Sequence, residues 1–458
     1  MKKLSAICLL TLGLLMGYQQ SAHAVEVFET PTGVLKWNKE KAFDGYTLLS
    51  PNTGTNSYLL DMEGNIVHEW KTKYRPGLYA ELLPNGNLLR GYREATFKVP
   101  FGGATTGIQE LDWEGNVVWQ FTPKNPDQTT HHCFKRLPNG NTLVLVWERK
   151  STAEAYEKGR AKGTLPEKDE FIYDGQKYGE IWPDALLEID AQGNEVWSWH
   201  VWDHIGMGED QFNINYILPN SHYYSDSDWT HFNSIDYIPE TNQILLCSRN
   251  FGEVFLLNKE TGKIEFRWGN PSNRGKGVAP SWINAHDQQL FGPHNATWLG
   301  DNKIMIFDNG WQNPEHNRSR VVIIDIKTKK IVWEYSAVNM NSFYSAFQGA
   351  AQKLPNGNIF VTSSNTGHVF EITCEEKPEV VWEYINPFVK GVPTALLTEE
   401  DAVRAEINLL LNYTHRSYRY AKDFSGFKDK KFSEPKKLFP DAPCWRELYE
   451  KARMLKAQ

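Results

Sequence analysis

Short apolar runs recur along the chain, and each is followed by a polar turn and a second apolar segment that ends in tryptophan. In the clearest copy, an apolar run ends at Leu111, a turn spans Asp112 to Asn116, and two valines precede Trp119. The other copies end at Trp70, Trp197, Trp268, Trp333 and Trp382. Alternating apolar residues around a turn rich in Asp, Gly and Asn predict a β-hairpin. The pattern therefore predicts six hairpins of one kind.

A second phrase follows five of these six copies. It reads Leu-Pro-Asn-Gly-Asn at 83–87, 137–141 and 354–358, and it recurs in weaker form at 238–242 and 299–302. Each occurrence predicts a second hairpin turn, and two hairpins make the four strands of one propeller blade. We therefore expect an all-β fold, a six-bladed β-propeller over residues 25–390. The strand from Tyr46 to Leu49 should fill the gap after the sixth copy and close the ring.

Segments without the repeat complete the domain plan. Insertions at 150–178 and 200–229 should decorate one face of the propeller and carry function. After Pro387 the pattern becomes helical, so residues 391–458 should form a mainly helical extension packed on the propeller. Residues 1–24 have the features of an export signal: Lys2 and Lys3, an apolar stretch too short to span a membrane, and a small-residue cleavage site ending at Ala24. We expect a periplasmic protein with no membrane span after cleavage.

Composition narrows the function classes. Seventeen Trp, 20 Tyr and 23 Phe suit stacked sheets better than a helical bundle. A net charge of −7 argues against a nucleic-acid partner. Four cysteines follow the export signal, and none has metal-ligand spacing. One disulfide and four free thiols remain equally open for Cys133, Cys247, Cys374 and Cys444.

Some blades carry a histidine at a position where the equivalent residue of other blades is different. His132, His231 and His294 precede the second-phrase turn in three consecutive blades. His368 and Arg320 begin a later strand in two blades. Strands that start at one level of a propeller should bring these side chains together at one end of the central channel. A lone histidine is more often a core residue, but the set of them favours a site, because buried cations are costly without a partner or purpose.

The residue types favour anion chemistry. A metal site is the weaker option, because no carboxylate or thiolate accompanies the histidines to balance the charge. Neutral imidazole is a nucleophile, an acid or a base near neutral pH, and a guanidinium fits a tetrahedral oxyanion. This set suits transfer of a sulfuryl or phosphoryl group, and it calls for no cofactor.

Several stretches resemble one known family. They are 228–235, 244–249, 294–310, 319–322, 332–335, 343–370 and 414–419. In order and spacing they are similar to the bacterial aryl-sulfate sulfotransferases that act without 3′-phosphoadenylyl sulfate, and the likeness runs from about residue 180. The family fold is a six-bladed propeller. Its best-known members also carry an N-terminal β-sandwich, for which too few residues precede Tyr46.

The resemblance implies roles for individual residues. The transiently sulfated histidine corresponds to His368, the two other channel histidines to His231 and His294, and the active-site arginine to Arg320. Substrate contacts are expected from His132, Asn233, Arg249, Tyr418 and Arg419.

The implied reaction is ping-pong: His368 takes a sulfuryl group from a phenolic sulfate ester and passes it to a phenolic acceptor through a sulfohistidine. A hydrolase, in which water is the acceptor, remains open, and so does the oligomeric state. Two other hypotheses are a quinoprotein-like oxidoreductase, which shares the Thr261-Gly262-Lys263 to Trp268 pattern, and a non-enzymatic ligand-binding or scaffold propeller.

Overall fold

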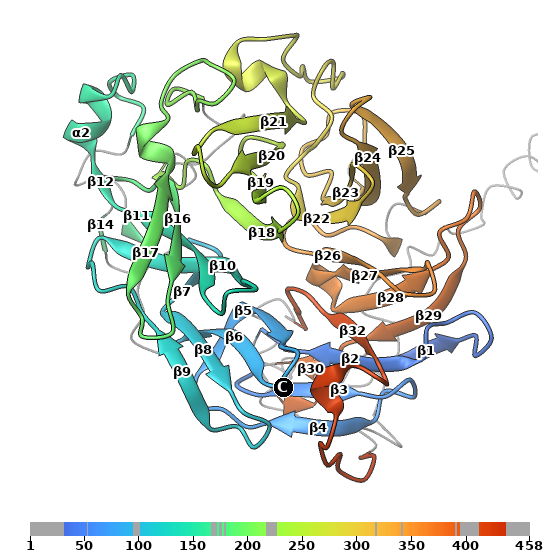
Figure 1. Cartoon of the computed structure of the whole chain (residues 1–458). Helices are drawn as coiled ribbons and strands as arrows, with labels where there is room; N and C mark the ends of the chain where they lie inside the picture. Colours follow the sequence, from blue (N-terminus) through green and yellow to red (C-terminus); the bar gives the residue numbers. More distant parts are fainter. Residues whose placement is uncertain are drawn as a thin grey trace, which may run out of the picture.

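Six sheets surround a central axis, and each forms one blade (Figure 1). The computed structural model describes residues 32–436, apart from 53, 95–100, 166–171, 174–175, 178–179, 217–226, 317, 340–341, 390–391 and 394–411. The all-β, six-bladed prediction is confirmed. The ordering of strands within each sheet decides which side chains reach the axis.

The strands of each blade are given from the axis outward. The first blade has β32 (Tyr418–Ala421), β2 (Gly45–Leu49), β3 (Ser57–Leu60) and β4 (Ile66–Trp70). The second has β5 (Arg75–Leu82), β6 (Leu88–Arg93), β8 (Gly107–Leu111) and β9 (Val117–Phe121). The third has β10 (Gln128–Arg136), β11 (Thr142–Glu148), β16 (Asp184–Ile189) and β17 (Glu195–His200), with β7 (Ala104–Thr105) beside β10.

The other three blades follow the same order. The fourth has β18 (Phe232–Ile238), β19 (Gln243–Ser248), β20 (Glu253–Asn258) and β21 (Ile264–Trp268). The fifth has β22 (His294–Gly300), β23 (Lys303–Asp308), β24 (Arg320–Asp325) and β25 (Lys330–Tyr335). The sixth has β26 (Ala350–Lys353), β27 (Ile359–Ser363), β28 (His368–Ile372) and β29 (Val380–Ile385), with β1 (Gly33–Trp37) outside β29.

Small elements lie in the connections between the main strands and after the last strand. They are α2 (Thr152–Glu157), the pairs β12 (Lys150–Ser151) with β15 (Glu180–Ile181), β13 (Ile172–Tyr173) with β14 (Gln176–Lys177), and β30 (Phe388–Val389) with β31 (Val392–Pro393), and the 3-10 turns η2 (Val201–Asp203), η3 (Pro271–Arg274), η5 (Ser364–Thr366) and η7 (Ser425–Phe427).

The C-terminal strand closes the ring. β32 pairs antiparallel with β2, with Thr47 opposite Arg419, and so supplies the innermost strand of the first blade. The segment from Tyr46 to Leu49 is the second strand of that blade, so the gap is filled from the opposite end of the chain. Most of the helical extension expected at 391–458 lies outside the described residues, and residues 412–436 form β32 and a 3-10 turn.

The recurring tryptophan has a structural reason. Indole Nε1 donates to a carbonyl in the outer turn of the next blade, at 3.0 Å from Trp70 to Asp112 and 3.1 Å from Trp268 to Lys329. Trp382 makes the same bond to Met62 at 3.0 Å, which joins the last blade to the first. A buried indole needs a partner for its N–H. In these three blades the tryptophan therefore holds the blade against its neighbour.

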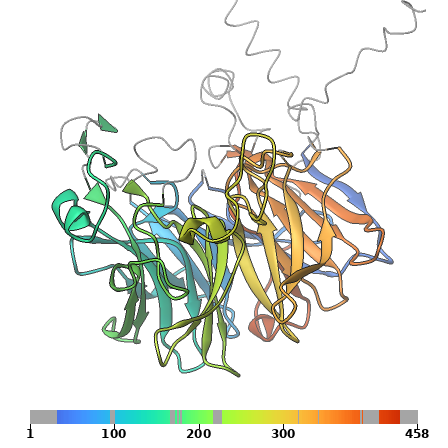
Figure 2. The same ribbon diagram turned by 90° about the horizontal axis from the view of Figure 1, so that it is seen from above.

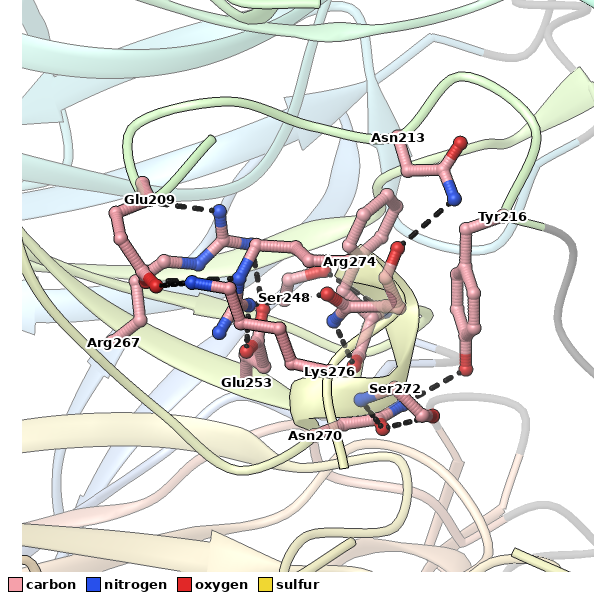
Figure 3. A network of polar contacts seen from close by, with 12 residues as sticks. Glu209, Asn213, Tyr216, Ser248, Glu253, Arg267, Asn270, Ser272, Arg274 and Lys276 are labelled. Atoms are coloured by element: carbon pink, nitrogen blue, oxygen red, sulfur yellow. Dashed lines mark hydrogen bonds and ion pairs between the residues drawn. The ribbon is translucent and has the colours of Figure 1, made fainter. Parts of the chain in front are cut away.

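The long connections gather at one end of the propeller and the short hairpin turns at the other (Figure 2). Figure 3 shows how the 201–216 connection is anchored to the fourth blade. The buried carboxylate of Glu253 accepts from Arg267 at 2.6 Å and from Arg274 at 2.5 Å, and Arg267 also donates to the carbonyl of Gln211. Lys276 pairs with Glu209 of the same connection. We call this end of the propeller the loop face. These ion pairs and hydrogen bonds hold its 201–216 connection in a defined position.

Cys133, Cys247 and Cys374 are free thiols, and Cys444 lies outside the described residues. No helix in the described part of the chain is long and apolar enough to span a membrane.

Candidate functional site

Four histidines from four blades surround the axis at the loop face. His132 lies in β10, His231 directly precedes β18, His294 begins β22, and His415 lies three residues before β32. The ring centroid of His132 is 4.6 Å from that of His231 and 6.1 Å from that of His415. His294 lies close enough to His132 and His415 for a charge on its ring to lower the pKa of both. We call these four residues the central histidines.

The backbone at the start of the inner strands aims these rings at the axis. His132 and His231 have φ of 45° and 48°, and Leu78, Asn295 and Gln348 are left-handed near the start of the inner strand in three other blades. The strand register shifts at these points in β5, β10, β18 and β22. A bulge re-aims a side chain in this way and is common beside active sites.

Burial favours the neutral form of three central histidines. It is the main cause that holds the pKa of His132, His294 and His415 well below the usual value. The next causes are the neighbouring His231 for His132, Arg249 for His294, and Arg416 for His415. His231 is the most accessible of the four at 7% exposed, against 3% or less for the others. A ligand arriving from the loop face would therefore meet His231 first.

His231 forms a dyad with Asp228. Its Nδ1 is hydrogen-bonded to Oδ2 of the buried Asp228 carboxylate. A carboxylate can only accept, so in the neutral ring Nδ1 carries the proton and Nε2 carries the lone pair. The carboxylate would also stabilise positive charge that develops on the ring. His231 is thus arranged as a nucleophile or a base.

The other central histidines are held differently. His294 Nδ1 lies 2.7 Å from Oδ1 of Asn309, and its Nε2 accepts the backbone N–H of Gln348 at 3.2 Å, so both ring nitrogens are occupied. Both ring nitrogens of His415 are buried without a partner. The ring of His132 lies against Gly103, where an ideal Cβ would stand 1.9 Å from a ring carbon. His294 is therefore a held group, while His132 and His415 keep polar atoms available.

Two arginines flank the ring of histidines. The backbone N–H of Arg249 donates to the carbonyl of His231 at 3.0 Å, and its guanidinium lies 4.4 Å from the ring centre of Trp311. Arg416 is buried, and its partners are the carbonyl of Asn233 at 2.5 Å, the thiol of Cys133 at 3.4 Å and the ring of Tyr79. The two guanidinium groups bring positive charge to the site, which favours an anionic ligand, while the carboxylate of Asp228 lies beside His231.

The predicted convergence holds for His132, His231 and His294, but His368 and Arg320 do not join them. Both begin third strands, β28 and β24, which lie two strand spacings, about 10 Å, from the innermost strand of their blades. His368 Nε2 turns to Glu383 of the outer strand at 2.8 Å. Arg320 donates to Asp308 at 2.9 Å, to Glu334 at 2.9 Å and to the carbonyl of Gln289. Equal height along the axis does not imply equal distance from it.

The expected substrate-binding residues divide in the same way. Arg249 lies beside the central histidines, and Tyr418 lies below them near Arg416. Asn233 donates to the carbonyl of Pro293 at 2.7 Å and so ties neighbouring blades together. Arg419 forms a fully buried ion pair with Glu371 at 2.6 Å and serves the closure of the ring.

Sequence reasoning missed three residues of this site. Asp228 stands three residues before His231, and this spacing is the signal in the sequence that points to it. His415 and Arg416 lie in the C-terminal segment, which lacks the repeat, so comparing the blades could not find them. Among the described residues, no three His, Cys, Asp or Glu side chains are arranged to hold a metal ion.

Known structures share parts of this architecture at low similarity. A protein of unknown function from Bacteroides caccae is 13% identical, with a TM-score of 0.45, over 74% of this chain and 93% of that one. A streptogramin B lyase is 14% identical, with a TM-score of 0.40, over 80% and 86%. Hydrazine synthase of Kuenenia stuttgartiensis is 11% identical, with a TM-score of 0.40, over 78% and 80%. Likeness at this level says nothing about activity.

Comparison with curated proteins gives no match. The arylsulfotransferase family model, in contrast, matches residues 32–419, from the first described strand to β32, and so includes every blade and all four central histidines. A match of that extent supports aryl sulfotransferase activity in general and small molecules as substrates. The chain belongs to the arylsulfotransferase family.

Proposed function

We propose that the protein moves a sulfuryl group from a phenolic sulfate ester to a phenolic acceptor through a sulfohistidine intermediate. The observation that carries this proposal is the His231–Asp228 dyad, which offers an Nε2 lone pair at the loop face beside neutral imidazoles and Arg249. Family membership supports the substrate class.

The nucleophile in this proposal is His231. His368 is the less suitable candidate, because its Nε2 is occupied by Glu383 and its strand lies away from the axis. His294 has no lone pair to offer, because its Nε2 accepts a backbone N–H. His231 combines access, a fixed tautomer and a carboxylate that stabilises the charged ring.

The first half of the reaction charges the enzyme. Nε2 of His231 attacks sulfur, the N–S bond forms, and the S–O bond breaks with its electron pair leaving on the phenolate. In this step the guanidinium of Arg249, which stacks on Trp311 and whose charge acts on His294, stabilises the sulfuryl oxygens as their charge redistributes. Asp228 offsets the positive charge of the sulfated imidazole.

The second half of the reaction removes the sulfuryl group from the enzyme. An acceptor phenol, with a pKa of about 10, needs a base to become nucleophilic at neutral pH. His132, whose ring lies 4.6 Å from that of His231, is the neighbouring candidate. The phenolate oxygen attacks sulfur, the S–N bond breaks, and neutral His231 is restored.

The test uses the full chain with 4-nitrophenyl sulfate, with and without added phenol. The expected result is nitrophenolate release that depends on phenol, formation of phenyl sulfate, and a sulfuryl group on the peptide that contains His231. The variant His231→Gln should lose both the label and the turnover. Nitrophenolate release without any phenyl sulfate would indicate a hydrolase and overturn the transferase proposal.

We also propose that the protein acts in the periplasm, because residues 1–24 have the features of an export signal. Fractionation followed by N-terminal sequencing should give a periplasmic chain that begins at Val25. Full-length chain in the cytoplasm would contradict this.

A further inference from the structure

A fifth histidine lies directly behind one of the central histidines. The side chain of His131 is fully buried, and its ring stacks on Trp147, with centroids 4.0 Å apart and planes 6° apart. Its Nδ1 lies 3.0 Å from Nδ1 of His132. Two imidazoles therefore share one hydrogen bond on the side of His132 that faces away from Nε2.

A carboxylate completes the chain. Nε2 of His131 lies 2.9 Å from Oδ1 of Asp184, an ion-pair distance, although the N–H does not point along the line to the oxygen. Neither atom has a hydrogen-bond partner elsewhere, so each depends on the other. The second oxygen of Asp184 accepts from the Thr230 hydroxyl at 2.5 Å and from the backbone N–H of Phe232 at 2.9 Å. One carboxylate thus contacts His131 and the residues on both sides of His231.

The contact with Asp184 favours one pair of tautomers. A lone pair on Nε2 of His131 would face the carboxylate oxygen at 2.9 Å, so the proton of His131 belongs on Nε2, and its Nδ1 then accepts from Nδ1–H of His132. His132 then carries its lone pair on Nε2. If the shared proton crosses to His131, His132 can carry a proton on Nε2 instead. Movement of this one proton changes His132 from a base into an acid.

We propose that Asp184 and His131 form a proton relay that makes His132 the acid–base residue of both half-reactions. This inference rests on the proposed function. In the second half, the phenol O–H gives its proton to Nε2 of His132 while the Nδ1 proton of His132 passes to His131. The phenolate oxygen bonds to sulfur and the S–N bond breaks. In the next first half, the protons return along the same chain to the leaving phenolate.

The relay avoids leaving a positive charge on the ring of His132. Burial and the nearby His231 hold the pKa of His132 well below its usual value, so a positive charge on that ring is unfavourable. Transfer across the shared hydrogen bond puts the charge on the ring beside Asp184 instead, away from the central histidines. A buried charge is tolerated when it is paired in this way. His131 and Asp184 are therefore positioning residues that act through His132.

The experiment separates the two half-reactions with His131→Gln. Glutamine can accept from His132 and donate to Asp184, but it cannot take up a proton. Nitrophenolate is a stable leaving group that needs no acid, so its burst from 4-nitrophenyl sulfate should stay within about threefold of wild type. Transfer to phenol should fall about 100-fold at neutral pH, within the usual contribution of general acid–base catalysis.

The pH profile distinguishes this role from a structural one. Without the relay, phenol must arrive already ionised, so transfer by the variant should rise about tenfold per pH unit toward the phenol pKa of about 10, while wild type stays flat near neutrality. His131→Phe keeps the stack on Trp147 and should give the same profile if glutamine does not fold there. His204→Gln, a histidine that likewise stacks on a tryptophan, Trp199, at 4.9 Å, is the matched control and should match wild type.

The two proposals fail in different ways. If wild type gives neither a burst nor a sulfated enzyme, the proposed function is wrong. If wild type gives both, but the His131 variants lose burst and transfer equally at every pH, or lose neither, the relay is wrong.

Discussion

The dyad predicts that a single atom exchange will disable the nucleophile. Asp228→Asn keeps the size of the side chain, and the backbone carbonyl of residue 228 still accepts from Asn250 at 2.5 Å, so the local fold should persist. Oδ1 of Asp228 has no partner, which leaves the new amide free to turn either way. With its NH2 toward His231 the ring takes the wrong tautomer, and with its oxygen toward the ring the negative charge is missing.

The expected size follows from what the ring becomes. Attack on sulfur makes the imidazole cationic, and the charge-assisted bond to Asp228, which is only 5% exposed, strengthens as that charge appears. We expect a loss of about 3–5 kcal/mol of transition-state stabilisation, or roughly 10²- to 10⁴-fold in the burst rate. Stopped-flow measurement of nitrophenolate release from 4-nitrophenyl sulfate gives this rate directly.

The matched control is Glu383→Gln, which removes the carboxylate from His368 in the same manner. That variant should keep the wild-type burst. If Glu383→Gln slows the burst at least tenfold and Asp228→Asn leaves it within threefold of wild type, the nucleophile is His368 and the reasoning from strand position is refuted. Thermal melting of both variants checks that the propeller is intact.

Four further outcomes follow from the site and the ring closure. His368→Ala should keep the sulfuryl label in intact-mass analysis, and its disappearance would return the nucleophile to that residue. Gly103→Ala should lower turnover at least about tenfold, because a Cβ would lie 1.9 Å from the ring of His132 and the glycine has φ of +102°; normal kinetics would contradict the packing. Arg419→Met should cost about 3–5 kcal/mol in urea unfolding by leaving Glu371 buried without its cation, and a loss below about 1 kcal/mol would argue against that pairing. Folding lowers the pKa of three central histidines, so the unfolded chain binds more protons than the folded chain below about pH 6.5. The free energy of unfolding should therefore be highest above that pH and should fall by up to about 1.4 kcal/mol per pH unit for each ring as the pH drops. A flat profile from about pH 7 to 5 would contradict the burial of these rings.

The blades were predictable because a hairpin is local. Its turn residues, its alternating strands and its tryptophan all lie within about twenty residues, so one sequence repeated six times shows the unit directly. The closure of the ring was not, because β32 carries neither phrase and its partner β2 lies at the other end of the chain. Long-range pairing of a short strand leaves no local pattern.

The site was half predictable for a related reason. Comparing blades gives the height of a residue along the axis, which found His132, His231 and His294, but it gives no radius. The radius depends on which strand of the blade is innermost, and the structure makes it the strand before the second phrase. The second phrase of the sixth blade lies between β26 and β27, and His368 begins the next strand, β28. It therefore lies at the same height along the axis as the site but farther from the axis.

The C-terminal strand links the stability of this protein to its chemistry. Docking of β32 seals the first blade through Arg419 and Glu371, and the same segment delivers His415 and Arg416 to the axis. Arg416 is a buried cation whose partners come from two other blades, the Asn233 carbonyl and the Cys133 thiol, so it can be accommodated only once the ring is assembled. A propeller that has not yet closed therefore lacks both its last innermost strand and the positive charge beneath the central histidines. Anion chemistry at the loop face should accordingly appear in the same step as the completed fold, and changes that loosen β32 should lower activity and stability together.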